Sequence, residues 1–148
     1  MQSRHVRTLQ QFEAAYLAGL IDGEGTITLS RRHANERRQL VVSVVSTERE
    51  IVAWVLSTVG AGKITRKRTT AKHHAPSFTY TVSNRQALAV LRQAAPYLQS
   101  YKRARAHLAI VHYVELTPRN GKYSPEADAA RCKFEESFLN LKARLPSN

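Results

Sequence analysis

The sequence contains few residues that could cross-link the chain or hold it in a membrane. Its single cysteine, Cys132, excludes an internal disulfide and a zinc site built from several thiolates. No apolar run approaches the roughly 18 residues that a transmembrane helix needs. The basic residues 1–10 lead directly into a patterned helix instead of the apolar core of a signal peptide. We therefore expect an intracellular protein that is not secreted and has no membrane partner.

Acidic residues are scarce relative to basic ones. The 148 residues include 23 Lys and Arg but only 11 Asp and Glu, which gives a formal net charge of +12. The basic residues cluster along the chain, at positions 31–32, 37–38, 63–68, 72 and 102–105. A charge that only aids solubility would be spread evenly, whereas clustered charge predicts a polyanionic partner, most commonly nucleic acid. We expect nucleic acid, and not a small molecule, as the ligand.

The order of predicted elements indicates an α+β fold in one domain, residues 1–148. Hydrophobic periodicity and turn residues predict helix, strand, strand, helix, strand, strand and three further helices. These elements lie at about 9–22, 26–32, 39–47, 48–59, 62–68, 77–83, 84–95, 100–115 and 124–144. Because the strands come in adjacent pairs, we expect antiparallel hairpins rather than parallel units.

The first predicted helix has two contrasting faces. Small residues recur with helical spacing on one face, at Ala15, Ala18, Gly19 and Asp22. Bulky residues form a second stripe that could enter the domain's own core: Phe12, Tyr16 and Leu20. Gly19 should cost the helix roughly 1 kcal/mol relative to alanine, so we expect a second helix to pack directly on it. That second helix could belong to the same chain or to another copy.

Residues 17–25, LAGLIDGEG, end this helix in two carboxylates interleaved with glycines. They resemble the motif that names the LAGLIDADG homing endonucleases, with Gly23 for its second alanine and Glu24 for its last aspartate. Seven of nine positions agree, and the element order is similar to that family's α-β-β-α-β-β-α core plus C-terminal helices. Because the chain holds one motif, it resembles the single-motif, homodimeric branch.

The resemblance implies a site-specific DNA endonuclease that cuts a long pseudo-palindromic duplex as a homodimer. The small face of the motif helix, Ala15, Ala18, Gly19 and Asp22, would then lie at the dimer axis. Glu24 and the backbone carbonyl of Gly23 would hold a divalent cation, for which hard oxygen ligands suit Mg²⁺. Each protomer would supply one carboxylate, and the metal ions would support hydrolysis of a phosphodiester bond.

The family places two further polar groups near the scissile phosphate. One follows the second strand, where we choose Glu48 over Thr47. Glu48 could equally be a residue at a helix N-terminus whose negative charge is favoured by the helix dipole. The other is a lysine after a Pro-aromatic-Leu segment. Here residues 96–98 fit that segment, and Lys102 fits the lysine, with Arg103 as the alternative. A cation there would stabilise charge that develops on the phosphate.

Alternation along the strands predicts which residues face DNA, since a twisted antiparallel sheet can lie in the major groove and read base edges. The expected reading set is Thr28, Ser30, Arg32, Gln39, Val41, Ser43, Val45, Lys63, Thr65, Lys67, Thr79 and Thr81. A second set is expected to contact phosphates, which position a protein without specifying sequence: Arg31, Arg37, Arg66, Arg68 and Lys72. A slip of one residue near a hairpin would reverse a strand's faces.

Other functions would share the fold and the charge. A non-cleaving protein of this type could act as an RNA maturase or as a DNA-binding regulator. Such a protein need not keep an acidic metal ligand, so the carboxylate at Glu24 favours the nuclease. A basic protein of the ribosome would explain the charge but not the motif at residues 17–25.

Overall fold

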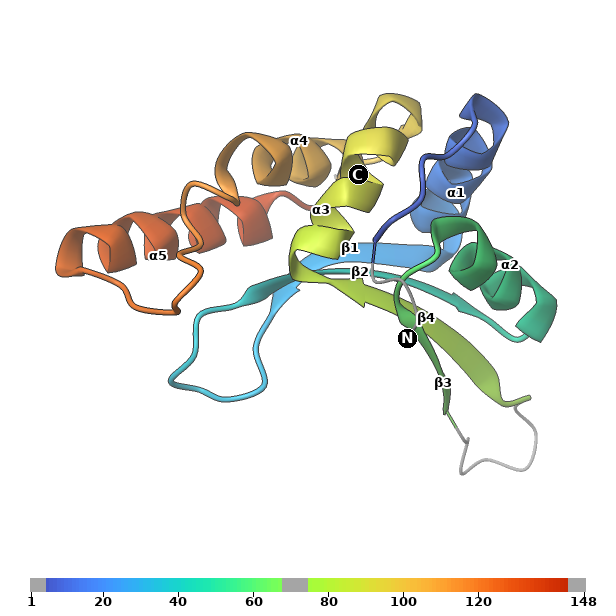
Figure 1. Ribbon diagram of the computed structural model, residues 1–148, viewed down its shortest axis with the longest axis horizontal. Helices are drawn as coiled ribbons and strands as arrows, with labels where there is room; N and C mark the ends of the chain where they lie inside the picture. The colour runs from blue at the N-terminus through green and yellow to red at the C-terminus, as the bar shows by residue number, and fades with distance from the viewer. Residues whose placement is uncertain (1–4, 68–74, 144–148) are drawn as a thin grey trace, which may run out of the picture.

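The computed structural model describes residues 5–67 and 75–143, and Figure 1 shows the arrangement of their elements. The chain forms α1 (Gln11–Glu24), β1 (Gly25–Ser30), β2 (Gln39–Ser46), α2 (Arg49–Val59), β3 (Lys63–Lys67), β4 (Ser77–Ser83), α3 (Asn84–Ala94), the short 3-10 helix η1 (Ala95–Tyr97), α4 (Lys102–His112) and α5 (Pro125–Asn140). The predicted α+β class and element order are confirmed. Within the described ranges, no helix combines the length and the apolar character needed to cross a bilayer.

The four strands form one antiparallel sheet in the order β1-β2-β4-β3. The two hairpins therefore join through β2 and β4, which pair from Val41–Ser83 to Ser46–Phe78. The α-helices gather over one face of the sheet, and the opposite face carries none (Figure 1). Alternate strand residues such as Ile27, Val42 and Tyr80 point to the helices and are buried. Helices α4 and α5 pack beside β1.

Helix α1 differs from its predicted bounds at both ends. It begins at Gln11, not at Leu9, because Gln10 is the N-cap and its backbone N–H donates to the Glu13 carboxylate over 2.9 Å. It continues through Glu24, so the second carboxylate of the motif is the last helical residue. Gly25 begins β1 directly. A Cβ at that position would collide with the backbone of Ser43 and Ile21, which explains why the motif ends in glycine.

The faces of α1 correct the sequence interpretation. Phe12 and Tyr16 do not enter the core: their exposed fractions are 66% and 49%. Ala18 is fully buried within its own chain, so it cannot contribute to a contact surface with a partner. Ala15 and Gly19 are exposed, and a Cβ at Gly19 would meet nothing in this chain. The small-residue face expected at Ala15, Ala18 and Gly19 therefore turns partly inward, because residue 18 shares the buried side of α1 with Leu17.

Candidate nucleic-acid interface

The face of the sheet away from the helices is lined by polar and small side chains in cross-strand register. Thr26 pairs with Ser43, and Ser43 pairs in turn with Thr81 on the other side. The Thr26 and Ser43 hydroxyls lie 2.6 Å apart and share a hydrogen bond. Other members of the expected reading set also lie opposite one another on neighbouring strands of this face. These pairs are Thr28 with Val41, Ser30 with Gln39, Val45 with Thr79, Thr79 with Thr65, and Thr81 with Lys63.

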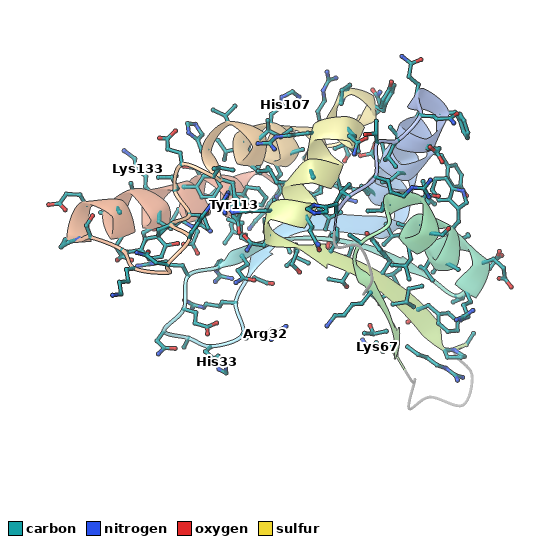
Figure 2. The ribbon with its side chains drawn as sticks, viewed as in Figure 1. Arg32, His33, Lys67, His107, Tyr113 and Lys133 are labelled. Atoms are coloured by element: carbon teal, nitrogen blue, oxygen red, sulfur yellow. The ribbon has the colours of Figure 1, made fainter. Side chains whose placement is uncertain are left out.

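The two lysines of β3 add positive charge to this polar face. Lys63 pairs with Thr81, and Lys67 pairs with Ser77 near the far end of the strand (Figure 2). Both lysines are exposed. Arg66 pairs with Phe78 and has the parity of Ile64, so it projects from the opposite face of β3. The sheet therefore separates Lys67 from its neighbour Arg66, as strand alternation predicts.

The structure changes the expected role or position of several arginines. Strand β1 ends at Ser30, so Arg32 lies in the following loop and strand alternation does not fix its direction. Arg31 is exposed in the same loop. Arg37 is not free to act as a phosphate clamp, because its guanidinium binds Asp128 of α5 through hydrogen bonds of 2.7 and 2.5 Å. The predicted contacts Arg68 and Lys72 lie outside the described residues.

Asp22 and Lys102 tie the end of α1 to the start of α4. The Asp22 carboxylate accepts hydrogen bonds from the Gln99 N–H at 2.8 Å, the Ser100 N–H at 3.2 Å and the Ser100 hydroxyl at 2.5 Å. Lys102 Nζ donates in the opposite direction, to the carbonyl oxygens of Ile21 at 2.8 Å and of Asp22 at 2.9 Å. Lys102 thus adds a donor at the C-terminal end of α1, and Asp22 holds the two residues that precede Tyr101, the N-cap of α4.

The pKa shifts follow from this arrangement. Burial by itself would raise the pKa of Asp22, but hydrogen bonds from Ser100 and Gln99, with the charge of Lys102, hold it below its ordinary value. Burial lowers the pKa of the Lys102 ammonium; the Asp22 and Glu24 carboxylates oppose this shift, and the Arg105 guanidinium adds to it. Lys102 is therefore close enough to Glu24 for their charges to interact.

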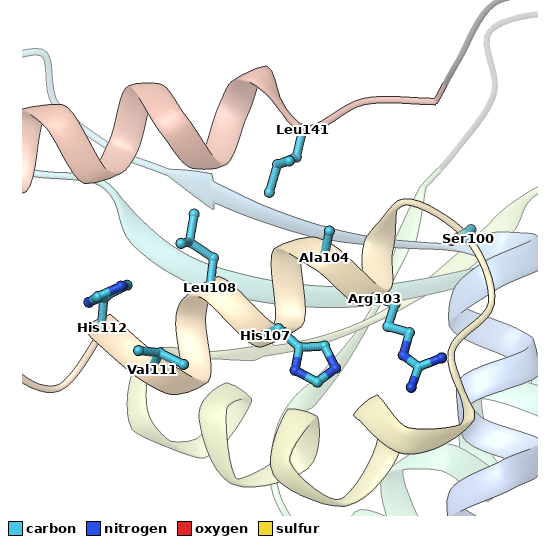
Figure 3. Close-up of a pocket in the computed structure, with 8 residues that line it drawn as sticks. All are labelled: Ser100, Arg103, Ala104, His107, Leu108, Val111, His112 and Leu141. Carbon is cyan, nitrogen blue, oxygen red and sulfur yellow. The ribbon is translucent and has the colours of Figure 1, made fainter.

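Arg103, the alternative to Lys102, occupies a different place. Its side chain is exposed and lines a hollow on the outer side of α4, together with His107, Val111 and Leu141 (Figure 3). Lys102 is almost completely buried against the end of α1. Of the two cations, Lys102 therefore lies at the end of α1, on the carbonyls of Ile21 and Asp22, close in sequence to Glu24.

The Glu24 carboxylate is exposed and receives no hydrogen bond or ion pair from the described part of the chain. Gly25 pairs with Val44, so Glu24 lies at the end of the sheet where β2 finishes and α2 begins. Glu48 is the N-cap residue of α2 at this end, and its side chain is also exposed. Within the described ranges no three His, Cys, Asp or Glu side chains gather in one protomer.

The oxygen atoms at the end of α1 are of the kind that binds a hard divalent cation. A free carboxylate and exposed backbone carbonyls are the oxygen ligands that Mg²⁺ prefers, with water completing its coordination. One protomer supplies one such carboxylate, Glu24, beside the exposed Gly23. A complete site would need oxygen ligands from another source, such as a second copy or a bound phosphate.

Sequence reasoning did not foresee Ser100 or Arg105. Ser100 donates to Asp22 through its N–H and its hydroxyl, and its sequence signal was a serine two residues before α4. Arg105 is buried and donates to the carbonyl oxygens of Ile27 at 2.8 Å and Leu141 at 2.7 Å. Two of the three basic residues in the cluster at 102–105, interpreted as a nucleic-acid contact, are thus buried and bind backbone carbonyls.

The similarity of this chain to known proteins lies in its three-dimensional structure. No protein-family model matches the sequence, and no curated protein matches it. The homing endonuclease I-CvuI, solved in complex with DNA, superposes with a TM-score of 0.72 over 93% of this chain and 87% of its own, at 21% identity. The archaeal intron-encoded homing endonuclease I-Vdi141I, also complexed with DNA, gives a TM-score of 0.59 over 93% and 88%, at 15% identity.

A third similar structure is a longer chain, of which this protein covers about half. The LAGLIDADG meganuclease I-AabMI, bound to uncleaved DNA, superposes with a TM-score of 0.61 over 90% of this chain but 53% of its own length, at 21% identity. The chain therefore has the fold of the LAGLIDADG homing endonucleases. The resemblance of residues 17–25 predicted this fold correctly.

Proposed function

We propose that this protein is a site-specific DNA endonuclease that hydrolyses phosphodiester bonds with a divalent metal ion. The observation that carries the proposal is the exposed carboxylate of Glu24 at the edge of the polar sheet face, on the same helix end whose Ile21 and Asp22 carbonyls bind Lys102. The solved structures with this fold are DNA complexes of homing endonucleases. The net charge of +12 suits the same partner.

The polar sheet face is the surface proposed to read base edges. A two-stranded or larger antiparallel sheet fits the major groove, where each base pair presents a distinct pattern of donors and acceptors. The rows of Thr, Ser and Gln supply short polar side chains, and Lys63 and Lys67 can donate to guanine. Val41 and Val45 on the same face suit thymine methyl groups. Arg31 and Arg66, which are exposed, are proposed to contact phosphates.

Chemistry is proposed at the end of α1. Glu24 and the Gly23 carbonyl would hold Mg²⁺, which would lower the pKa of a bound water and neutralise charge on the phosphate. Lys102 donates two of its three N–H groups to carbonyls of α1, so one is left for a phosphate oxygen. Glu48, which is exposed at the start of α2, is proposed to orient solvent near the scissile bond.

A homodimer would provide the second carboxylate. The exposed face of α1 contains Phe12, Ala15, Tyr16, Gly19 and Gly23, and Tyr16 packs edge-on against the ring of Trp54 of α2 at 4.8 Å. The residues of this face are small near the C-terminal end of α1 and bulky and apolar near its N-terminal end. Such a surface suits close packing of a second α1. This chain covers about half of I-AabMI, so the length of I-AabMI would accommodate two domains of this size in one chain.

A two-fold dimer implies a pseudo-palindromic target, since each protomer reads one half-site. The alternative function is a non-cleaving maturase or regulator with the same fold. The carboxylate at Glu24 and its proximity to Lys102 favour cleavage, because a protein that only binds nucleic acid has no need for that pair.

The decisive experiment is incubation of the protein with a plasmid library of random inserts and Mg²⁺, followed by sequencing of the cut ends. Cleavage should occur at one family of related pseudo-palindromic sites, and it should disappear with EDTA. The matched control is Glu24→Gln protein prepared in the same way, which excludes a contaminating nuclease. Sequence-selective retention of DNA without any cut ends would favour the regulator.

A further inference from the structure

The loop between β1 and β2 is fastened to α5 through its returning residues. The Arg37 guanidinium binds both oxygens of Asp128, at 2.7 and 2.5 Å. The next residue is held through its backbone: the Arg38 N–H donates to Glu135 at 3.2 Å, and the Arg38 carbonyl accepts from Arg131 at 2.6 Å. Side chains of helix α5 thus bind two consecutive residues that lead into β2.

The residues that hold the loop are themselves fixed. Arg131 is 1% exposed, and its guanidinium stacks over the rings of Tyr113 at 4.8 Å and Phe134 at 5.4 Å. It also donates to the Leu116 carbonyl and to the Thr117 hydroxyl. Glu135 is 7% exposed, and its carboxylate lies 3.8 Å from both Arg131 and Arg37. Arg131 Nε and Glu135 Oε2 lie 3.8 Å apart without a hydrogen bond, so attraction between opposite charges joins these two buried side chains.

The outgoing part of the loop, residues 31–36, is exposed throughout. Its one backbone hydrogen bond in the described structure joins the Glu36 N–H to the His33 carbonyl over 3.1 Å. Arg32 and His33 project from this loop beyond the end of β1 (Figure 2). The loop borders Ser30 and Gln39, the last pair on the polar sheet face. Its position relative to that face therefore depends on the attachment at Arg37 and Arg38.

We propose that Asp128 and Glu135 of α5 are positioning residues that set which bases the β1–β2 loop reads at the outer end of each half-site. The proposal rests on the proposed function, because it assumes that DNA lies along the polar sheet face. Neither side chain needs to touch DNA. Asp128 acts through Arg37, and Glu135 acts through the Arg38 backbone, to place Arg31 and Arg32.

The first test measures cleavage preference at every position of the target. Asp128→Asn keeps the size of the side chain but removes the charge, and Glu126→Gln, an exposed carboxylate of the same helical turn, is the control. Asp128→Asn should reduce base discrimination about three- to tenfold, at the positions that Arg32→Ala also changes. Discrimination at positions read by Lys67 should not change. A uniform loss across all sequences, or an unaltered profile, would overturn the proposal.

A second arm tests the coupling itself. If Asp128 acts through Arg37, the double variant Arg37→Ala/Asp128→Asn should show the same preference profile as Arg37→Ala alone. Additive changes would mean that Asp128 acts by another route and would contradict the proposal.

The third arm needs no DNA and separates this inference from the proposed function. Amide hydrogen exchange at Glu36 and Arg38, whose N–H groups are hydrogen-bonded to His33 and Glu135, should be about tenfold faster in Asp128→Asn than in wild type, with the β2 and β4 amides unchanged and Glu126→Gln like wild type. Unchanged exchange in the loop would refute the positioning role. Failure of the wild type to bind or cut DNA would instead refute the proposed function, whatever the exchange result.

Discussion

Asp22 and Lys102 join the end of α1 to the segment that leads into α4. The carboxylate of Asp22 accepts hydrogen bonds from the residues that precede α4, while the ammonium of Lys102 donates to two carbonyls at the end of α1, at 2.8 and 2.9 Å. A negative charge lies at the N-terminus of one helix and a positive charge at the C-terminus of the other, which is the favourable orientation for both helix dipoles. This pairing holds the helix end that carries Glu24.

The Asp22 carboxylate makes stability depend on pH. Its pKa in the folded protein lies below the ordinary value of 3.8, so the folded state favours the ionised form. Its contribution is complete above the unfolded pKa and is lost as the pH falls through 3.8 toward the lower folded pKa. We expect Asp22→Asn to cost about 1 kcal/mol near neutral pH, as for the loss of a helix cap. Urea unfolding at several pH values would measure this difference.

Ser100→Ala is the matched variant for this experiment, because it removes one donor to Asp22 and keeps the carboxylate. The difference between wild type and Asp22→Asn should shrink in acid, and it should be smaller in the Ser100→Ala background. A difference that stays constant from neutral pH to about pH 3 would rule out linkage through Asp22.

Lys102→Met should destabilise the fold as well as affect the chemistry. The Asp22 carbonyl would lose its Lys102 donor, while the Ile21 carbonyl would keep the Gly25 N–H, and leaving a polar group of this kind unpaired costs about 1–3 kcal/mol. Denaturant unfolding should show this loss, while Arg103→Met, on the exposed side of α4, should leave stability almost unchanged. Because the cation is also proposed to meet the phosphate, cutting rates measured on fully folded protein should fall at least 100-fold. Normal cutting by folded Lys102→Met would exclude that role.

Glu24→Gln should abolish cutting and leave DNA binding intact. The substitution keeps the side chain's size but removes the negative charge proposed to hold the metal ion, and no hydrogen bond within the described chain is lost. Binding should be measured with Ca²⁺ or without metal, and cleavage with Mg²⁺. Glu115→Gln, an exposed carboxylate at the end of α4, is the control. Cleavage by Glu24→Gln at the wild-type rate would refute the proposed active site.

Gly19→Leu should convert a dimer into a folded monomer. A Cβ at residue 19 meets no atom of its own chain within 4 Å, and the position is exposed, so we expect the substitution to leave the fold intact. In a closely packed helix pair the same side chain has no space. Sedimentation of the free protein and of its DNA complex would measure the change, with Ala104→Leu, on an exposed face of α4, as control. A wild type that is monomeric in both states would contradict the proposed assembly.

Lys67 and Arg66 provide an internal comparison for DNA reading, because these neighbours face opposite sides of β3. Lys67→Ala should relax preference at one pair of symmetry-related positions, at a cost of about 1–3 kcal/mol for the preferred base. Arg66→Ala should weaken all sequences alike and reduce the salt dependence by about one unit of slope. Cleavage of a saturation-mutated target at two salt concentrations distinguishes them. Interchanged results would mean that the strand faces are reversed.

The sequence alone was sufficient for the element order and for the polar face of the sheet. Alternation in residues 39–46 and 77–83 has a period of two, and a register shifted by one residue would turn Val42, Val44, Tyr80 and Val82 away from the core. The motif at residues 17–25 was specific enough to predict the fold. Local pattern and motif therefore determined the architecture, because each depends on neighbours in the chain.

Only the tertiary structure decided which charged and aromatic side chains are free. Arg37, Arg105 and Arg131 look alike in the sequence, yet each is engaged by groups 36 to 93 residues away. The sequence predicts that Phe12 and Tyr16 lie in the core, but both are exposed. The side of α1 that faces the core is instead formed by Leu17, Ala18 and Ile21, which are buried. Helical periodicity gives the spacing of a face, and packing against distant elements determines which face is buried.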